Sequence, residues 1–123
     1  MALIAVIDDD FNFCRMLMDF FQLKGHQTEA FLSGADALKA LQDPENTLPA
    51  VILLDVMMPE LDGYTVYTKL QEDERTRQVP IVILTAKGRT RSLFESSLKI
   101  AAFVEKPVVL PELAKIVAKA IGP

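Results

Sequence analysis

The sequence of 123 residues has no tryptophan, a single cysteine and a single histidine. Cys14 has no partner for an intrachain disulfide, so we expect a reduced, small core residue rather than a reactive thiol. The apolar stretch "ALIAVI" (2–7) is too short to cross a bilayer, and no basic segment or cleavage site of a signal peptide accompanies it. These absences predict a cytoplasmic protein that does not insert into a membrane.

The chain also has few basic residues, 13 compared with 17 acidic ones, and its net charge is -4. An acidic domain repels nucleic-acid phosphates, so we expect no direct binding of nucleic acid. Half of the residues are hydrophobic and 24% are charged, which is typical of globular domains. A chain of this length buries one core, and we expect a single domain over residues 1–123.

Apolar runs alternate with segments of helical spacing along the chain. The expected strands are 2–7, 28–31, 50–54, 79–85 and 102–105, and the expected helices are 11–24, 34–43, 63–73, 92–99 and 111–122. Ser33 is a candidate N-cap, and Gly25 and Gly122 are candidates for helix ends. In the first helix, the spacing places Phe13, Leu17 and Phe20 on one side. Such alternation predicts an α/β fold, a doubly wound five-stranded parallel sheet between two layers of helices.

Chemically active residues stand at four of the expected strand ends: Asp8, Asp9 and Asp10 after the first, Asp55 after the third, Thr85 at the fourth and Lys106 after the fifth. The carboxyl ends of parallel strands share one edge, where ligands bind. Two charges ~5 Å apart repel by roughly 3 kcal/mol at an effective dielectric constant of ~20. A domain is stable by only ~5–15 kcal/mol. A purely structural carboxylate cluster is therefore costly, and a Mg²⁺ ion with oxygen ligands removes that objection.

Several motifs have a structural interpretation that we favour over a functional one. Asp10 suits a helix N-cap better than a ligand, and Asp62-Gly63 suits a turn. His26 follows Gly25 in a loop, which argues against a phosphohistidine. Met57-Met58 suits loop packing rather than a soft-metal site. A locally basic stretch is more typical of a solvated surface than of a docking patch: Arg75, Arg77, Lys87, Arg89 and Arg91.

The stretches "VIDDD", "LLDVMMPELDG", "VILTA" and "FVEKP" occur in this order, and together they make the chain resemble the receiver domain of two-component response regulators over essentially its full length. The resemblance implies a CheY-like, flavodoxin-like sheet with strand order 2-1-3-4-5. It also implies a phosphoprotein of a phosphorelay, which accepts a phosphoryl group in a Mg²⁺-dependent reaction and changes conformation.

The resemblance further implies a role for each residue. Asp55 would accept the phosphoryl group from the phosphohistidine of a histidine kinase. Asp9 would bind Mg²⁺ directly and Asp8 partly through water, with Asp55 and the Met57 carbonyl as further ligands. Thr85 and Lys106 would each contact a phosphoryl oxygen. Phe103 would turn inward as a switch when Thr85 is drawn to the phosphoryl group, while Pro59 and Gly63 would shape the loop after the acceptor.

The expected partners are a sensor histidine kinase or phosphotransfer protein and a downstream output domain or protein, with homodimerisation on phosphorylation as a further option. Receivers commonly use the face of the fourth helix, fifth strand and fifth helix for output, and here this region departs from the family pattern. One residue fewer separates Thr85 from Lys106, Lys99-Ile100 replaces a common Gly-Ala pair, and Val108 replaces a frequent aromatic. Met57 and Lys87 are candidates for tuning the phosphoryl lifetime, in a direction that the sequence does not give.

Two other functions stay open at this point. A pseudo-receiver would bind partners without phosphorylation. A Mg²⁺-dependent phosphohydrolase with an aspartate nucleophile, as in haloacid dehalogenase-like enzymes, would need a second aspartate two residues after the first, where this chain has Met57. The leading hypothesis is a phosphoacceptor signalling domain, which is no enzyme except toward its own phosphorylation and dephosphorylation.

Overall fold

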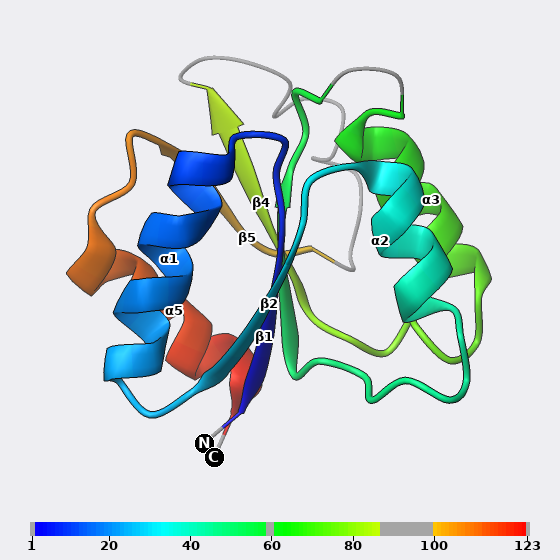
Figure 1. Ribbon diagram of the computed structural model, residues 1–123, viewed down its shortest axis with the longest axis horizontal. Coiled ribbons are helices and arrows are strands. Elements are labelled where there is room, and N and C mark those ends of the chain that lie inside the picture. The colour runs from blue at the N-terminus through cyan, green and yellow to red at the C-terminus, as the bar shows by residue number, and fades with distance from the viewer. Residues whose placement is uncertain (1, 59–60, 87–99, 123) are drawn as a thin grey trace.

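The computed structural model describes residues 2–58, 61–86 and 100–122, in which strands and helices alternate (Figure 1). The strands are β1 (Leu3–Ile7), β2 (Gln27–Phe31), β3 (Val51–Asp55), β4 (Ile81–Ala86) and β5 (Ile100–Lys106). The helices of the described residues are α1 (Phe11–Leu23), α2 (Gly34–Leu41), α3 (Gly63–Glu72) and α5 (Leu110–Ile121). The expected helix at 92–99 lies outside the described residues.

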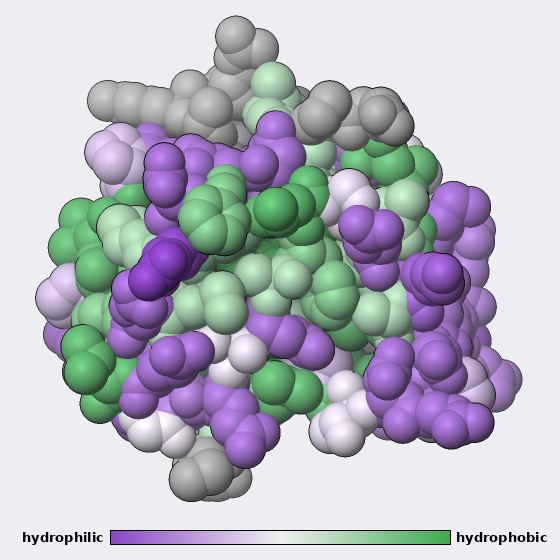
Figure 2. All heavy atoms as spheres, in the orientation of Figure 1, coloured by the Kyte–Doolittle hydropathy of each residue, from purple (hydrophilic) through white to green (hydrophobic). Residues whose placement is uncertain are grey.

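All strand pairs are parallel, and their order is β2-β1-β3-β4-β5, which confirms the predicted topology. Helices α1 and α5 cover one face of the sheet, and α2 and α3 cover the other, so that the described residues form three layers (Figure 1). In the view onto the β2 side, apolar residues gather across the centre between α1 and α2, and polar residues cover the outer side of α2 and α3 (Figure 2).

Two cores follow from the period of two along each strand. Ala5, Ile52 and Ile83 belong to the cluster under α2 and α3, whereas Val6 and Leu53 belong to the cluster under α1 and α5. Strands β1 and β3 are buried on both faces, which is why they read as continuous apolar runs. No helix within the described residues is both long and apolar enough to cross a membrane.

The side of α1 with Phe13, Leu17 and Phe20 packs against the core, as expected, but the most deeply buried residues also include Cys14 and Phe21. Cys14, Leu17 and Phe21 are buried, while Phe13 and Phe20 are only half-buried at its flank. The first helix has apolar residues on several neighbouring positions, so spacing alone does not show which are buried most deeply, and contact with β1 and α5 decides this in favour of Cys14 and Phe21.

Element ends agree with the predicted chemistry, with small shifts. Asp10, Ser33 and Asp62 each accept a hydrogen bond from the N–H group three residues later, at 3.1, 3.1 and 2.8 Å, as N-caps do. Gly25 and Gly122 have φ of 92° and 85° at helix ends. Strand β5 is longer than expected, because it pairs with β4 from Ile100 to Lys106.

Gly63 begins α3 directly against the backbone of β3. A Cβ atom on this residue would lie 2.4 Å from the Asp55 carbonyl oxygen and 2.4 Å from the Val56 Cα. The Gly63 N–H also donates to the Val56 carbonyl at 3.3 Å. This close approach fixes α3 next to the end of β3, where Asp55 lies.

We expect Gly63→Ala to lower the free energy of unfolding by about 3 kcal/mol, because backbone atoms cannot move aside as a flexible side chain can. Gly25→Ala is the matched control, since nothing lies within 4 Å of its added Cβ and only the positive φ is unfavourable. That control should cost only about 1 kcal/mol. Urea unfolding of both variants measures the difference, and equal costs would contradict the close approach at Gly63.

Candidate functional site

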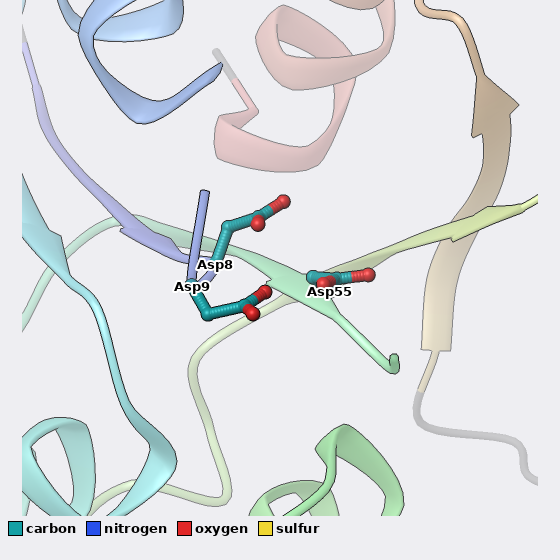
Figure 3. A group of neighbouring side chains, drawn as sticks. All are labelled: Asp8, Asp9 and Asp55. Atoms are coloured by element: carbon teal, nitrogen blue, oxygen red, sulfur yellow. The ribbon is translucent and has the colours of Figure 1, made fainter. Parts of the chain in front are cut away.

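Three carboxylates meet at the carboxyl edge of the sheet (Figure 3). Asp8 follows β1 directly, and Asp55 is the last residue of β3. The pairing of Ile7 with Leu54 brings the two aspartates to the same level of adjacent strands. One oxygen from each of Asp8, Asp9 and Asp55 lies within 4.8 Å of the others. Asp8 is 1% exposed and Asp55 3% exposed, while Asp9 is open to solvent.

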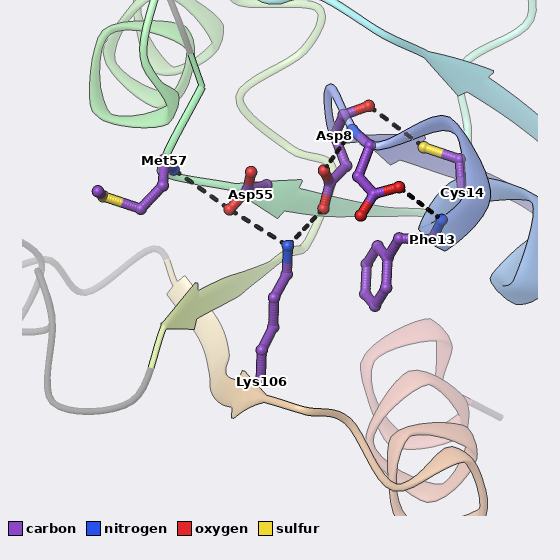
Figure 4. Close-up of polar contacts among 7 residues, drawn as sticks. Asp8, Phe13, Cys14, Asp55, Met57 and Lys106 are labelled. Atoms are coloured by element: carbon purple, nitrogen blue, oxygen red, sulfur yellow. Dashed lines mark hydrogen bonds and ion pairs between the residues drawn. The ribbon is translucent and has the colours of Figure 1, made fainter.

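Lys106, the last residue of the edge strand β5, adds a positive charge to this cluster (Figure 4). Its Nζ lies 2.7 Å from Asp8 Oδ2 and 3.7 Å from Asp55 Oδ1. Asp55 and Lys106 continue the strand alternation that faces α1 and α5, so their side chains meet although β4 separates their strands. The prediction that strand-end residues converge is confirmed for these four residues.

Backbone donors in the loops after β1 and β3 hold the buried carboxylates, and a thiol of α1 holds the backbone of Asp8. The Asp10 N–H donates to Asp8 Oδ1 at 2.9 Å, and the Met57 N–H donates to Asp55 Oδ1 at 3.2 Å. The Cys14 thiol donates to the Asp8 carbonyl oxygen at 3.3 Å. Two of the donors are backbone groups two residues beyond the carboxylate, so the turn after each strand fixes the orientation of its aspartate.

Burial is the main influence on the charge of Asp55. It raises the pKa of this carboxyl, the charge of Asp8 raises it further, and the Met57 N–H and Lys106 offset only part of the rise. For Lys106, burial alone would lower the pKa, but the hydrogen bond and charge of Asp8 outweigh it and the pKa is raised. Lysine therefore stays charged, yet it does not by itself compensate for the crowding of carboxylates around Asp55.

Cys14 is buried behind the cluster. Burial and the nearby carboxylates, Asp8 first among them, raise the pKa of its thiol to about 12. The thiol is therefore protonated at neutral pH and unreactive, which confirms the interpretation as a core residue.

Thr85 and Phe103 reach the same edge from the other face of the sheet. Thr85 is 2% exposed and follows Leu84, the residue that pairs with Asp55. Phe103 pairs with Ile83 and is partly buried against the core beneath α2 and α3. The two residues lie on the same face of neighbouring strands, which the expected coupling of a Phe103 movement to a Thr85 movement requires.

Phe13 is a neighbour of the site that the sequence did not indicate. Its ring centroid lies 4.4 Å from Lys106 Nζ. Helical spacing placed this residue on one apolar side of the first helix, and the available signal for the site was its position in the first turn after the acidic run. Gly63 was expected to shape the loop, and the contact of its backbone with Asp55 gives that expectation a physical basis.

Other singled-out residues lie away from the cluster or have structural roles. The His26 Nδ1 accepts a hydrogen bond from the Ala2 N–H at 3.1 Å. Met58 packs in the core, but Met57 is 48% exposed, so the packing interpretation holds for Met58 alone. Arg75 donates to the carbonyls of Leu41 and Asn46. Several residues named above lie outside the described residues: Pro59, Lys87, Arg89, Arg91 and Lys99.

The donor set fits a hard divalent cation, because it consists of carboxylate oxygens at one partly open edge. Among the described residues, the Cys14 sulfur nearby is protonated and turned toward the Asp8 carbonyl oxygen, so soft-metal chemistry is not favoured.

The sequence matches the family described as the response regulator receiver domain over residues 4–118. It is 34% identical over 120 residues to the regulatory protein AtoC of Escherichia coli, which covers 96% of this chain and 25% of AtoC. It is 25% identical over 122 residues to the polar-differentiation response regulator DivK of Brucella ovis, which covers 97% of this chain and 95% of DivK.

The fold is similar to that of the receiver domain of a sensor histidine kinase from Pseudomonas aeruginosa, with a TM-score of 0.84 and 23% identity over 99% of this chain and 98% of that one. The solved structure of that protein has a magnesium ion coordinated in its active-site cleft. The comparisons favour neither the pseudo-receiver nor the phosphohydrolase alternative. With the family match extending over most of its length, the chain belongs to the response regulator receiver domains, the phosphoacceptor signalling domains of two-component systems.

Proposed function

We propose that Asp55 is the phosphoryl acceptor and that Asp8, Asp9, Asp55 and the Met57 carbonyl hold Mg²⁺ beside it. The observation that carries this proposal is the convergence of three carboxylates and one lysine at a single strand edge. The magnesium-containing solved relative supports the choice of cation. When bound, Mg²⁺ would neutralise charge on the phosphoryl oxygens and on the carboxylates.

In the proposed transfer, an Asp55 oxygen attacks the phosphorus of a phosphohistidine. The new O–P bond forms as the P–N bond breaks, and the electron pair of that bond returns to the imidazole of the donor. Little covalent help is needed in such transfers, so positioning and charge stabilisation dominate. Lys106 lies within 3.7 Å of Asp55 and can pair with one phosphoryl oxygen. The Thr85 hydroxyl would donate to another from the opposite face of the sheet.

The raised pKa of Asp55 gives the cation a second role. A nucleophilic carboxylate must be ionised, and burial beside Asp8 opposes ionisation. Asp8, Asp9 and Asp55 would hold the cation, and its positive charge would favour the ionised form of Asp55. We therefore expect the acceptor role of Asp55 to depend on the metal.

The acyl phosphate would adjust the conformation through Thr85 and Phe103. A phosphoryl group adds up to two negative charges and strong hydrogen-bond acceptors. It can shift a two-state equilibrium only if the two states contact it differently, and a Thr85 hydroxyl that moves toward it would provide that difference. Phe103, which packs on the same face of the sheet as Thr85, would then change its position and with it the surface of β5.

The kinase and the output are proposed at the level of class. AtoC and DivK are both regulators by name, and this chain spans 25% of AtoC but 95% of DivK. We propose a cytoplasmic receiver domain that takes phosphate from a sensor histidine kinase or phosphotransfer protein and acts on an output domain or protein. Output would use the face of β5 and α5, together with the expected fourth helix, which lies outside the described residues, and homodimerisation is one form of it.

Incubation with acetyl phosphate and Mg²⁺ should add one phosphate to the chain, as measured by intact mass spectrometry. Asp55→Asn should abolish the adduct. Asp62→Asn is the matched control, because it is a nearby exposed aspartate and Asn caps α3 equally well. An unmodified wild-type chain would overturn the phosphoacceptor role. Steady turnover of phosphate esters would instead point to a phosphohydrolase.

Asp9→Asn should weaken Mg²⁺ binding at least tenfold, because it removes the exposed carboxylate ligand. Asp10→Asn should bind Mg²⁺ nearly as well as wild type, since its side chain caps α1 through the Phe13 N–H and Asn serves there too. Isothermal titration calorimetry compares the two. Equal losses would mean that total charge, not ligation, controls the affinity.

In chelator at neutral pH, Asp9→Asn and Asp55→Asn should each raise the melting temperature by roughly 2–6 °C, because each relieves repulsion in the cluster. Folding raises the pKa of Asp55, so its ionisation destabilises the folded state and stability falls as pH rises through that pKa. The advantage of Asp55→Asn should therefore shrink on acidification, where the carboxyl is protonated in both states.

Thermal unfolding across a pH series with EDTA, and again with Mg²⁺, measures this effect. Added Mg²⁺ should stabilise the wild type more than either variant. The electrostatic account is wrong if both variants melt below wild type in EDTA.

A further inference from the structure

Lys106 has a third neighbour besides Asp8 and Asp55. Its Nζ stands over the ring of Phe13, 4.4 Å from the centroid, and the ring lies beside the lysine chain in Figure 4. Phe13 is half-buried in the first turn of α1, and its N–H donates to the Asp10 carboxylate at 3.1 Å. The cap that begins the helix therefore holds the backbone of Phe13 beside the site, and the half-buried ring lies against Lys106.

The two carboxylates and the ring hold the ammonium group in different ways. The Asp8 Oδ2 is the nearest group, 2.7 Å from Lys106 Nζ, but Asp8 would also bind the proposed cation, which would weaken its attraction for the lysine. Asp55 at 3.7 Å would become the acyl phosphate that Lys106 must contact. The ring face attracts a cation and coordinates no metal, so it stays available to the lysine when both carboxylates change their partners.

We propose that Phe13 is a positioning residue for phosphoryl transfer, which keeps the Lys106 ammonium over Asp55 through its ring face. This proposal rests on the proposed function of Asp55. A free lysine side chain has about 2 kcal/mol of rotamer entropy to lose. Only 28% of the Lys106 side chain is exposed, and the ring borders it, so that part of the ordering precedes the arrival of the phosphoryl group.

A second lysine–phenylalanine pair in the chain, Lys24 and Phe20, provides a control for this interaction. Lys24 Nζ lies 5.3 Å from the centroid of Phe20, on the same helix. Phe13 and Phe20 are both half-buried and both pack against the cluster under α1 and α5. Phe20, however, lies near the opposite end of α1 from the acidic cluster. If Phe13 acted only through packing, its replacement by leucine and that of Phe20 should change the rate of phosphorylation to a similar extent.

The experiment measures the rate at which acetyl phosphate modifies Asp55 at saturating Mg²⁺, where the P–O bond to acetate breaks and acetate leaves. Phe13→Leu should slow this rate about threefold to tenfold. Phe20→Leu should leave it within about twofold of wild type while lowering stability to a similar extent in urea unfolding. Phe13→Tyr and Phe13→Trp keep an aromatic face and should retain most of the rate.

Fluorinated phenylalanines at position 13 separate the ring face from packing, because fluorine weakens the negative face with little change of shape. The rate should fall steadily with each added fluorine. In a Lys106→Met background, where the residual rate is measured over longer times, Phe13→Leu should have no further effect.

A flat fluorine series, or an equal loss with and without Lys106, would overturn the role of Phe13 and leave the acceptor role of Asp55 intact. Failure of the acceptor role has a different signature, since then the wild-type chain gains no phosphate at all.

Discussion

The ion pair between Lys106 and Asp8 joins the last strand of the sheet to the first, across 98 residues of sequence. It brings a positive charge into a place where two buried carboxylates already crowd one another. Without it, Asp8 would be a buried charge without an opposite charge in contact, which costs several kcal/mol in other proteins. The pair places the Lys106 ammonium group beside both buried carboxylates, so that this edge of the sheet carries a basic group among its acidic ones.

Most of the fold could be predicted from the sequence, because the relevant signals are local. The runs around Ile4 and Leu53 are apolar on both faces, and only a parallel sheet covered by helices on both sides satisfies them. Caps at Asp10 and Ser33 were readable from the same kind of local chemistry, whereas Asp62, which was expected in a turn, also caps a helix. Convergence of Asp8, Asp55 and Lys106 followed from the rule that parallel strands end at one edge, together with the resemblance of four motifs to a family.

The remaining features depend on contacts between distant residues, which local patterns do not encode. Phe13 and Phe20 pack against the core on the expected side of α1 but are only half-buried, because packing against β1 and α5 buries Cys14 and Phe21 more deeply. The ring of Phe13 beside Lys106 depends on the distance between a helix and the far strand of the sheet. For the same reason, the tight contact of Gly63 with β3 could be suspected but not measured from the sequence.

The alternation of the strands divides the site between two cores. Asp55 and Lys106 extend the rows that pack under α1 and α5, while Thr85 and Phe103 extend the rows that pack under α2 and α3. A substitution under α2 and α3 can therefore change the packing around Phe103 while the residues that pack beneath α1 and α5, on the side of Asp55 and Lys106, keep their neighbours. The sheet thus separates the surroundings of the acidic cluster from those of Thr85 and Phe103.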